Sequence, residues 1–439
     1  MAQKKIKSEF IVIVLILAAF SFTLSQDTSS ITGAFSHDDD DDGSEEPPPI
    51  IDEDPPLFVV GADFYDGAAG KDSGKAYVYS SVDCAELWVA EGEQKGNAFG
   101  RSVSTLKDLD DDEKDEVIVG APYYTNANGD PVGKVYVFNG DDGTLLWTKE
   151  GELLISKHSS ITDFGSIVAD VPDLNGDDKA DVIVAAPSYQ YMSKRYTQGG
   201  RGYYQPFGKV YAYDGMNGNL LWSMKGEMPG DGFGEAIAGL RDVNGDGHGE
   251  VIVGASRYSQ DTGRRKMLGK IYVLSGLDGS IIWTKEGDKA RGKGFGRAVA
   301  GTPDIDGDGH GEVIVGDPYF WKFNSDRTDP IVIGKVYVYS GATGNLLWSI
   351  KGKAHMELLG AEVSGVPDVD SDKSGDVVIG EPWYRRGSLE FNGKAYVRAG
   401  ADSTLLWDAE GTQDQDYLGM ALSGLRDAND DKLGEVLIA

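Results

Sequence analysis

Tandem repetition is the feature of this chain that most constrains its fold. A Phe-Gly or Leu-Gly pair recurs six times, and successive copies begin 59 to 69 residues apart. The glycines of these pairs are Gly100, Gly165, Gly234, Gly296, Gly360 and Gly419. A Gly-Lys-x-Tyr element also occurs six times, starting at Gly74, Gly133, Gly208, Gly269, Gly334 and Gly393. Self-similarity at such a period is typical of solenoids, propellers and other repeat arrays.

Each unit contains four short runs that suit β-strands, and none shows helical periodicity. The runs are rich in Val and Ile, and clusters of Gly, Asp and Asn separate them. Four antiparallel strands per unit predict an all-β fold, a circularly closed β-propeller of four-stranded antiparallel blades over residues 57–439. A tryptophan recurs in the fourth run, and we expect it to pack between neighbouring blades. Its positions are Trp147, Trp222, Trp283, Trp348 and Trp407.

The two ends of the repeat array leave the number of blades open at six or seven. Residues 57–93 offer a second, third and fourth strand without a first, and residues 418–439 offer a first and a second. Six blades follow if these ends pair within one blade, which would remove exposed sheet edges. Seven follow if the chain is a piece of a longer protein, and its stop inside a strand-like run favours that interpretation.

An acidic loop separates the first and second runs of every unit. Side chains with oxygen atoms occupy loop positions 1, 3, 5 and 9 in all six copies. They are Asp108, Asp110, Asp112, Glu116; Asp173, Asn175, Asp177, Asp181; Asp242, Asn244, Asp246, Glu250; Asp304, Asp306, Asp308, Glu312; Asp368, Asp370, Asp372, Asp376; and Asp427, Asn429, Asp431, Glu435. Calcium takes about six to eight oxygen ligands, which alternating carboxylates on a tight turn can supply. The sequence predicts up to six structural Ca²⁺ ions, which would offset part of the net charge of −31.

Other metal chemistries fit these loops less well. An EF-hand needs a bidentate Glu at its last position, between two helices, whereas the matching residue here is Val or Ile inside a strand-like run. Magnesium demands stricter octahedral geometry, and zinc would need a Cys/His cluster. Loop position 7 should contribute a backbone carbonyl, so we expect the side chains of His248 and His310 to face solvent. An acidic turn without metal is the alternative for each loop.

The first 56 residues differ from the repeats in composition. Lysines precede an apolar run from Phe10 to Leu24, which predicts an export signal over residues 1–25, with an uncleaved signal anchor as the alternative. Residues 26–56 contain five consecutive aspartates and five prolines, which predict a disordered acidic linker.

Cys84 is the single cysteine, so no intramolecular disulfide can form, and we expect a buried structural thiol. The negative charge argues against nucleic acid, and the signal favours a secreted or cell-surface location.

The coupled pairs and acidic loops resemble the FG-GAP repeat of integrin α-subunit heads. Phe99-Gly100 pairs with Val119-Gly120-Ala121-Pro122, Phe164-Gly165 with Ala185-Ala186-Pro187, and Phe295-Gly296 with Gly316-Asp317-Pro318. The resemblance covers nearly everything after residue 57. It implies a seven-bladed extracellular propeller with calcium loops on its lower face and a role in cell adhesion or ligand recognition. Four of the six loops end in Glu, where the family typically has Asp, and disulfides are absent. A β-subunit-like partner is therefore left open.

Strand alternation predicts that the acidic loops lie on one face and the variable loops between second and third runs on the opposite face. Loops on a rigid scaffold commonly carry function, and these are rich in aromatic residues and Arg, which anchor interfaces. We expect a protein or glycan ligand on this face, bound by Tyr124, Tyr191, Tyr258, Trp321, Trp383 and Tyr384. The alternative is that these aromatic side chains only cover blade edges.

The sequence shows no spacing of Ser, His, Asp or paired carboxylates that points to catalysis, and we expect no enzyme activity. The run from Tyr339 to Trp348 also resembles the tryptophan repeat of quinoprotein dehydrogenase propellers. A quinoprotein-like or carbohydrate-active enzyme is therefore an alternative, although many quinoproteins use a vicinal cysteine pair that a single cysteine cannot supply. A purely structural surface protein is the third interpretation.

Overall fold

The computed structural model describes residues 12–14 and 57–439, except 82, 113, 154–161, 199–200, 260–266, 289–293, 324–328, 388 and 430. Every regular element in these residues is a β-strand, which confirms the all-β prediction. Because this part of the chain contains no helix, it contains no helix long and apolar enough to span a membrane. The predicted signal and linker lie outside the described residues, apart from a short strand at Val12–Val14.

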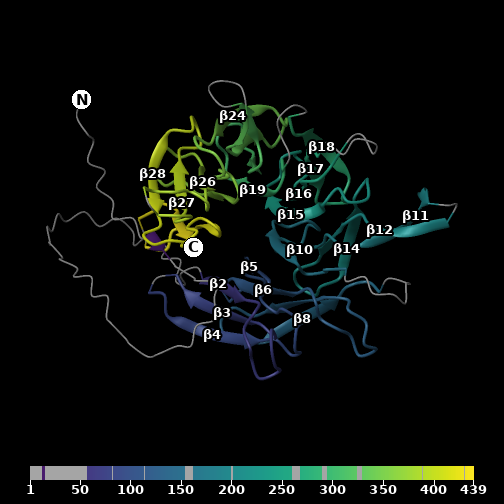
Figure 1. The fold of residues 1–439 in the computed structure, drawn as a ribbon. Helices are drawn as coiled ribbons and strands as arrows, with labels where there is room; N and C mark the ends of the chain where they lie inside the picture. The colour runs from purple at the N-terminus through teal and green to yellow at the C-terminus, as the bar shows by residue number, and fades with distance from the viewer. Residues whose placement is uncertain are drawn as a thin grey trace, which may run out of the picture.

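Six blades follow one another around a ring (Figure 1). The first has three strands, β2 (Leu57–Ala62), β3 (Lys75–Ser80) and β4 (Glu86–Glu91), and the next five have four antiparallel strands each. In chain order these five are β5 (Ser102–Leu106), β6 (Glu116–Ala121), β7 (Lys134–Phe138), β8 (Leu145–Glu150); β9 (Ile167–Val171), β10 (Asp181–Ala186), β13 (Lys209–Tyr213), β14 (Leu220–Lys225); β15 (Phe233–Leu240), β16 (Glu250–Ala255), β17 (Lys270–Ser275), β18 (Ile281–Glu286); β19 (Ala298–Thr302), β20 (Glu312–Asp317), β23 (Lys335–Ser340), β24 (Leu346–Lys351); and β25 (Val363–Val366), β26 (Asp376–Gly380), β27 (Lys394–Arg398), β28 (Leu405–Glu410). We number these blades one to six.

A C-terminal hairpin occupies a seventh position, beside blade six. Its strands β29 (Leu422–Leu425) and β30 (Glu435–Ile438) pair antiparallel, and β1 (Val12–Val14) pairs in parallel with β30. Arg426, just after β29, forms an ion pair with Asp115 of blade two at 2.6 Å and so links the end of the ring to its beginning. The ring therefore contains seven sheets, and the two ends form separate sheets rather than one shared blade.

Close contact between glycines of neighbouring blades explains why the Phe-Gly pairs recur together with the Gly-Ala-Pro segments. A Cβ atom on Gly120, in β6, would lie 1.9 Å from the carbonyl oxygen of Gly165 in blade three. Gly165 has a φ of +83°, which favours glycine, and its N–H donates to the Ala185 carbonyl at 3.1 Å. The same contact joins Gly61 to Gly100, Gly254 to Gly296, Gly316 to Gly360, and Gly380 to Gly419. The repeated motif thus sets the spacing between blades.

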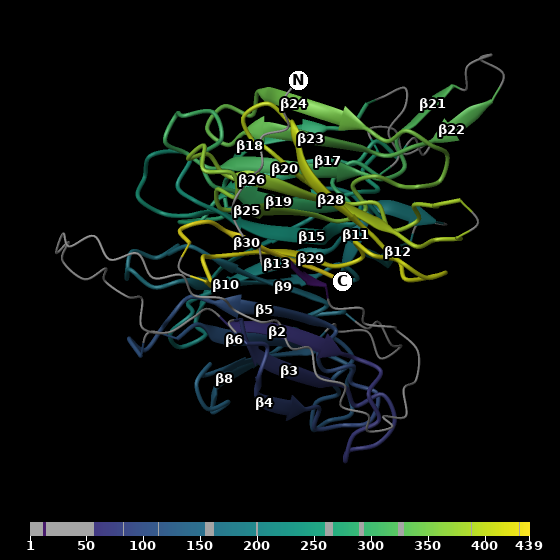
Figure 2. The same ribbon diagram turned by 90° about the vertical axis from the view of Figure 1, so that its left-hand side faces the viewer.

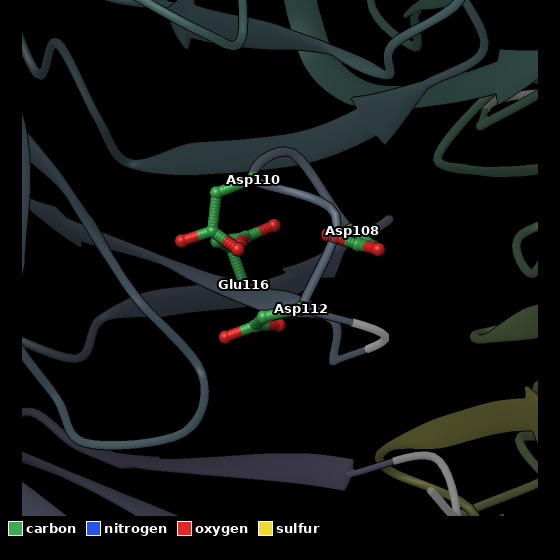
Figure 3. Close-up of side chains that lie close together, drawn as sticks. All are labelled: Asp108, Asp110, Asp112 and Glu116. Carbon is green, nitrogen blue, oxygen red and sulfur yellow. The ribbon is translucent and has the colours of Figure 1, made fainter. Parts of the chain in front are cut away.

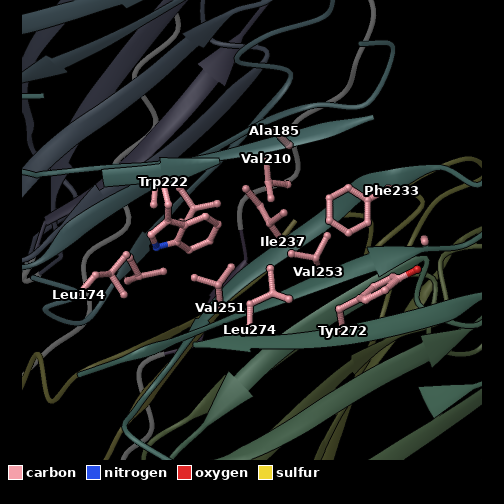
Figure 4. Packing of buried hydrophobic residues seen from close by; sticks show 14 of the residues in the cluster. Leu174, Ala185, Val210, Trp222, Phe233, Ile237, Val251, Val253, Tyr272 and Leu274 are labelled. Carbon is pink, nitrogen blue, oxygen red and sulfur yellow. The ribbon is translucent and has the colours of Figure 1, made fainter. Parts of the chain in front are cut away.

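Apolar side chains fill the space between blades, as Figure 4 shows for Trp222, Phe233, Val253 and Tyr272 between blades three and four. In blades two to six the second strands, such as β16, are buried along their whole length, which is why they appear in the sequence as continuous Val/Ile runs. The fourth-strand tryptophans of blades one to five also donate their indole N–H to a glycine carbonyl of the next blade. The pairs are Trp88 with Gly140, Trp147 with Gly215, Trp222 with Gly276, Trp283 with Gly341, and Trp348 with Gly400. Trp407 packs against the C-terminal hairpin, so the predicted packing of tryptophans between blades is confirmed.

The Gly-Lys-x-Tyr element places a lysine against two aromatic rings in every blade. In blade four, Lys270 Nζ lies 4.8 Å from the Tyr258 ring centroid and 4.4 Å from that of Tyr272. The same ammonium bonds to Glu227 of blade three at 2.9 Å. Equivalent ring pairs flank Lys75, Lys134, Lys209, Lys335 and Lys394. This sequence element therefore stabilises each blade and, in blades two to four, where the carboxylate belongs to the preceding blade, also the contact between the two blades.

Two extra hairpins interrupt the loops that join second to third strands. They are β11 (Gln190–Gln198) with β12 (Arg201–Pro206), and β21 (Trp321–Phe323) with β22 (Pro330–Val332). Both project from the same side of the ring in Figure 2.

Cys84 lies in the turn between β3 and β4 and is exposed, so the prediction of a buried thiol is wrong. The turn joins the two outermost strands of its blade, which places it at the surface.

Candidate metal centres and the opposite face

The loop between β5 and β6 gathers four carboxylates into one cluster. Asp108, Asp110, Asp112 and Glu116 each offer an oxygen, and these oxygens lie within 4.8 Å of one another. Figure 3 shows the four side chains around this single loop. Four hard oxygen ligands from one short segment form the kind of donor set that calcium prefers.

A hydrogen-bonded turn holds these loops in shape, as the loop between β19 and β20 shows. Asp304, at position 1, accepts bonds from Gly307 N at 2.7 Å and Gly309 N at 2.8 Å. These glycines have φ values of +83° and +88°, which other residues rarely adopt. Asp242 accepts the equivalent bonds in blade four. Although burial alone would raise its pKa, the backbone donors hold the pKa of Asp242 below its usual value.

A glutamate at position 9 is buried but only half satisfied. Glu312 Oε2 accepts a bond from Ile305 N at 2.6 Å, whereas Oε1 has no hydrogen-bond partner and the side chain is fully buried. Glu116 and Glu250 repeat this arrangement. Burial, together with the nearby aspartates, raises the pKa of all three to about 8. A buried acceptor without a partner costs about 1–3 kcal/mol, and a cation beside this oxygen would remove that cost, so these residues fit a bound calcium ion.

An aspartate at position 9 is satisfied differently. Asp181 accepts bonds from Leu174 N at 2.7 Å and Gly215 N at 2.8 Å, one to each carboxylate oxygen. Asp376 accepts the equivalent bonds from Val369 N at 2.8 Å and Gly400 N at 2.9 Å. Burial raises the pKa of both carboxyl groups to about 7. Both oxygens of these aspartates are therefore already hydrogen-bonded in the fold.

Five of the six predicted loops bring at least three carboxylates together. The clusters are Asp108, Asp110, Asp112, Glu116; Asp304, Asp306, Asp308, Glu312; Asp242, Asp246, Glu250; Asp368, Asp370, Asp376; and Asp427, Asp431, Glu435. Asn244 lies beside the third of these and donates its amide to Asp246 at 2.9 Å. Among the residues that the structure describes, the acids of the remaining loop, with Asp173, Asn175, Asp177 and Asp181, form no such cluster.

The side chain at position 7 contacts the preceding loop in three places. His310 Nδ1 lies 2.8 Å from the backbone carbonyl oxygen of Asp242, and the His248 ring lies beside Gly176. Lys179, at position 7 of the blade-three loop, donates a hydrogen bond from its ammonium group to the Asp111 carboxylate of the blade-two loop. The expectation that both histidines face solvent is wrong, because the acidic loops of neighbouring blades lie side by side and position 7 points along the ring.

The centre of the opposite face contains a cavity of about 690 Å³. Its wall includes Pro122, Pro187, Pro318 and Pro382, which begin the loops between second and third strands. Charged side chains of both signs surround it. Arg101 pairs with Asp63 at 2.8 Å, Glu235 pairs with Arg257 and lies 3.9 Å from Arg297, and Glu362 and Asp163 complete the lining. Sequence analysis did not identify these residues, because they come from different repeats. Their positions directly after or near the Phe-Gly pairs were the available signal.

The six predicted ligand-binding aromatic residues fall into different environments. Tyr124 and Tyr258 are buried, and their rings contact Lys134 and Lys270. Tyr384 likewise lies against Lys394. Trp383 lines the central cavity, Trp321 packs edge-on against Phe323 in the β21–β22 hairpin, and Tyr191 lies in β11. Exposed aromatic side chains that the prediction did not include are Tyr123, Tyr319 and Phe323.

Comparison with known proteins supports the repeat assignment. The FG-GAP repeat family matches residues 99–138, 164–213 and 233–274. Integrin alpha-3 of Cricetulus griseus is 31% identical over 173 residues, which cover 38% of this chain and 15% of that protein. Integrin alpha-6 of Gallus gallus is 33% identical over 159 residues, covering 35% of this chain and 13% of that protein. Integrin alpha-PS3 of Drosophila melanogaster is 34% identical over 121 residues, covering 27% and 10%.

The matched regions thus span no more than 15% of these integrins. The FG-GAP matches fall on blades two to four. Together with the ring of blades, these matches show a β-propeller that contains FG-GAP repeats and is similar to integrin α subunits over part of its length.

Proposed function

We propose that this protein is a calcium-binding, extracellular β-propeller that recognises a protein or glycan ligand and has no catalytic activity. Calcium would bind in the acidic loops on one face, and the ligand would bind on the opposite face. The observation that carries the metal assignment is the set of convergent carboxylates whose position-9 glutamates keep a buried oxygen without a partner.

The metal would be structural in this proposal. Each acidic loop joins the innermost strand of a blade to the buried second strand, so an ion would stabilise the connection between the centre of the ring and the blade. Because an ion that binds only the folded chain stabilises it by mass action, calcium would contribute directly to the free energy of unfolding. It would also offset repulsion among the clustered carboxylates.

The central cavity and its surroundings are the favoured ligand site. Tyr123, Tyr319 and Trp383 surround charged side chains of both signs, and aromatic and Arg side chains commonly anchor interfaces. A ligand with both charged and apolar groups would suit this lining. The integrin names of the relatives add weight to a role in adhesion, and the predicted export signal agrees with a secreted or cell-surface location.

Binding tests should use the full chain with Tyr319→Ala and Trp383→Ala combined, against a glycan array and a panel of purified extracellular-matrix proteins. Leu145→Ala with Leu220→Ala, at exposed positions of outer strands, is the matched control. We expect the first variant to lose binding at least tenfold while the control keeps it, with unchanged circular dichroism in both. Equal binding by both variants would contradict the assignment of the ligand face.

A further inference from the structure

The central cavity on the face opposite the acidic loops has a lining whose charges balance. Its volume of about 690 Å³ lies within the range of about 300–1,000 Å³ that is typical of small-ligand sites. Although the chain has a net charge of −31, the lining contains as many arginines as acids. They are Arg101, Arg257, Arg297, Asp163, Glu235 and Glu362. The lining therefore does not select a ligand by the sign of its net charge.

Most of these charged groups already have partners in the protein. The pairs are Arg101 with Asp63, Arg257 with Glu235, and the Ser188 hydroxyl with Asp163. A guanidinium has five N–H donors and a carboxylate has about four acceptor sites, so the paired groups keep hydrogen-bonding capacity to spare. An ionised ligand group would compete with these pairs. A hydroxyl group can instead accept from the guanidinium and donate to the carboxylate at the same time.

Glu362 differs from the other acids of the lining. It is half-buried, and its side chain forms no hydrogen bond or ion pair in the part of the chain that the structure describes, although Arg297 attracts it from a longer distance. Burial raises its pKa to about 7. Near neutral pH the group thus accepts hydrogen bonds when ionised and can also donate one when protonated. Both forms suit the hydroxyl groups of a ligand.

Aromatic side chains supply the apolar part of the lining. Tyr123, Tyr319 and Trp383 each follow the proline that begins a loop between second and third strands. Tyr319 is 42% exposed, yet a Cβ atom on Gly294 would lie only 2.7 Å from its Cδ2 atom, so the ring packs against the backbone there. Such rings offer apolar surface at a low cost in conformational entropy. A sugar ring has the matching surface, with an apolar C–H face and hydroxyl groups around its edge.

We infer that the central cavity binds an oligosaccharide. Tyr319 and Trp383 would pack against the faces of sugar rings, and Glu362 and the paired charges would bond to hydroxyl groups. The inference rests on the proposed function and narrows its ligand from a protein or glycan to a glycan. A stable protein partner needs about 800 Å² of surface on each side, whereas a chain of a few sugar rings can enter a concave site. Because hydroxyl groups suffice for this lining, the sugar needs no ionised group.

The test is isothermal titration calorimetry of the full chain with uncharged tetrasaccharides of glucose, mannose, galactose, xylose or N-acetylglucosamine. We expect at least one of them to bind at a single site per chain. Tyr319→Ala should weaken this binding by at least about tenfold, and Tyr319→Phe, which keeps the ring face, by less than about threefold. Glu362→Gln should weaken it by at least about threefold. The matched control is Phe323→Ala, because Phe323 is 46% exposed and lies outside the cavity lining, so this variant should bind as wild type does.

Two results would overturn the inference. One is a wild type that binds none of the tetrasaccharides, and the other is binding that Tyr319→Ala leaves unchanged. If Tyr319→Ala does not fold by circular dichroism, unchanged binding by Glu362→Gln has the same meaning. If the sugars fail but a purified matrix protein binds wild type and not the combined Tyr319→Ala and Trp383→Ala variant, the ligand is a protein and the proposed function stands. A chain that binds neither sugars nor matrix proteins contradicts the proposed recognition function itself.

Discussion

Replacing Lys270 by methionine tests whether the repeated lysine links neighbouring blades. The Lys270 side chain is 9% exposed, lies between the rings of Tyr258 and Tyr272, and bonds to Glu227 of blade three. Methionine preserves most of the apolar stem but removes the charge. Each cation–π contact at a desolvated site contributes about 1–2 kcal/mol. The ion pair adds less than about 1 kcal/mol because Glu227 is partly exposed.

Two ring contacts and the ion pair together predict that Lys270→Met lowers the free energy of unfolding by about 2–5 kcal/mol. Lys335 of blade five is the matched control. It also lies between two rings, but no carboxylate forms an ion pair with it within the described residues, and burial lowers its pKa. A lowered lysine pKa means that the charged form is less favourable in the fold than in the unfolded chain. Lys335→Met also loses two ring contacts, but the cost of burying this charge without an ion pair offsets them, so the substitution should cost less than about 1 kcal/mol.

The measurement is urea unfolding followed by tryptophan fluorescence in saturating calcium, with Glu227→Gln and the double variant completing a mutant cycle. The cycle should return a favourable coupling between Lys270 and Glu227. Equal losses for Lys270→Met and Lys335→Met, or zero coupling, would refute the idea that this lysine joins blades three and four.

Three further substitutions test other parts of the fold. Trp283→Phe removes the 2.7 Å hydrogen bond from the indole to the Gly341 carbonyl. In the same urea assay it should cost about 1 kcal/mol more than Trp407→Phe, because the Trp407 indole has no such acceptor in the described residues. Equal costs would contradict the role of that bond. Gly120→Ala would place a Cβ atom 1.9 Å from the Gly165 carbonyl oxygen and should prevent folding. Gly129→Ala is the control: its Cβ would lie in open space, and only the φ of +82° opposes it, so it should cost about 1 kcal/mol. A folded, stable Gly120→Ala variant would refute the glycine-contact explanation. Burial raises the pKa of Glu381 from 4.5 to about 7, so wild-type stability should fall as pH rises from the unfolded value through the folded one. Glu381→Gln should remove that dependence and gain up to about 3 kcal/mol relative to wild type between pH 5 and 8, and an unchanged difference between the two proteins would contradict the assignment.

The periodic features of the sequence predicted the fold because each corresponds to a contact that recurs in successive blades. Gly120 with Gly165, and Trp283 with Gly341, are local rules repeated around the ring. The acidic loops were likewise identifiable, since the candidate ligand residues of each loop lie within nine residues of one another. The contact between Arg426 and Asp115, which joins the two ends of the ring, involves residues more than 300 positions apart. No periodic pattern in the sequence predicts it.

The residues that sequence analysis placed wrongly or missed depend on contacts between repeats. His310 was expected to face solvent, but it contacts the loop of the preceding blade. Tyr124 and Tyr258 occur in variable loops, yet their rings are buried against lysines. The charged lining of the central cavity comes from single positions in several blades, so no continuous motif reveals it.

The most direct test of the metal assignment combines metal analysis of the purified chain with thermal unfolding in calcium and in EGTA. Each site filled at a free concentration of one hundred times its dissociation constant adds about 2.7 kcal/mol to the folded state. We therefore predict bound calcium and a midpoint that falls by more than about 10 °C in EGTA. Purified protein without any alkaline-earth metal, melting at the same temperature in both buffers, would contradict the account.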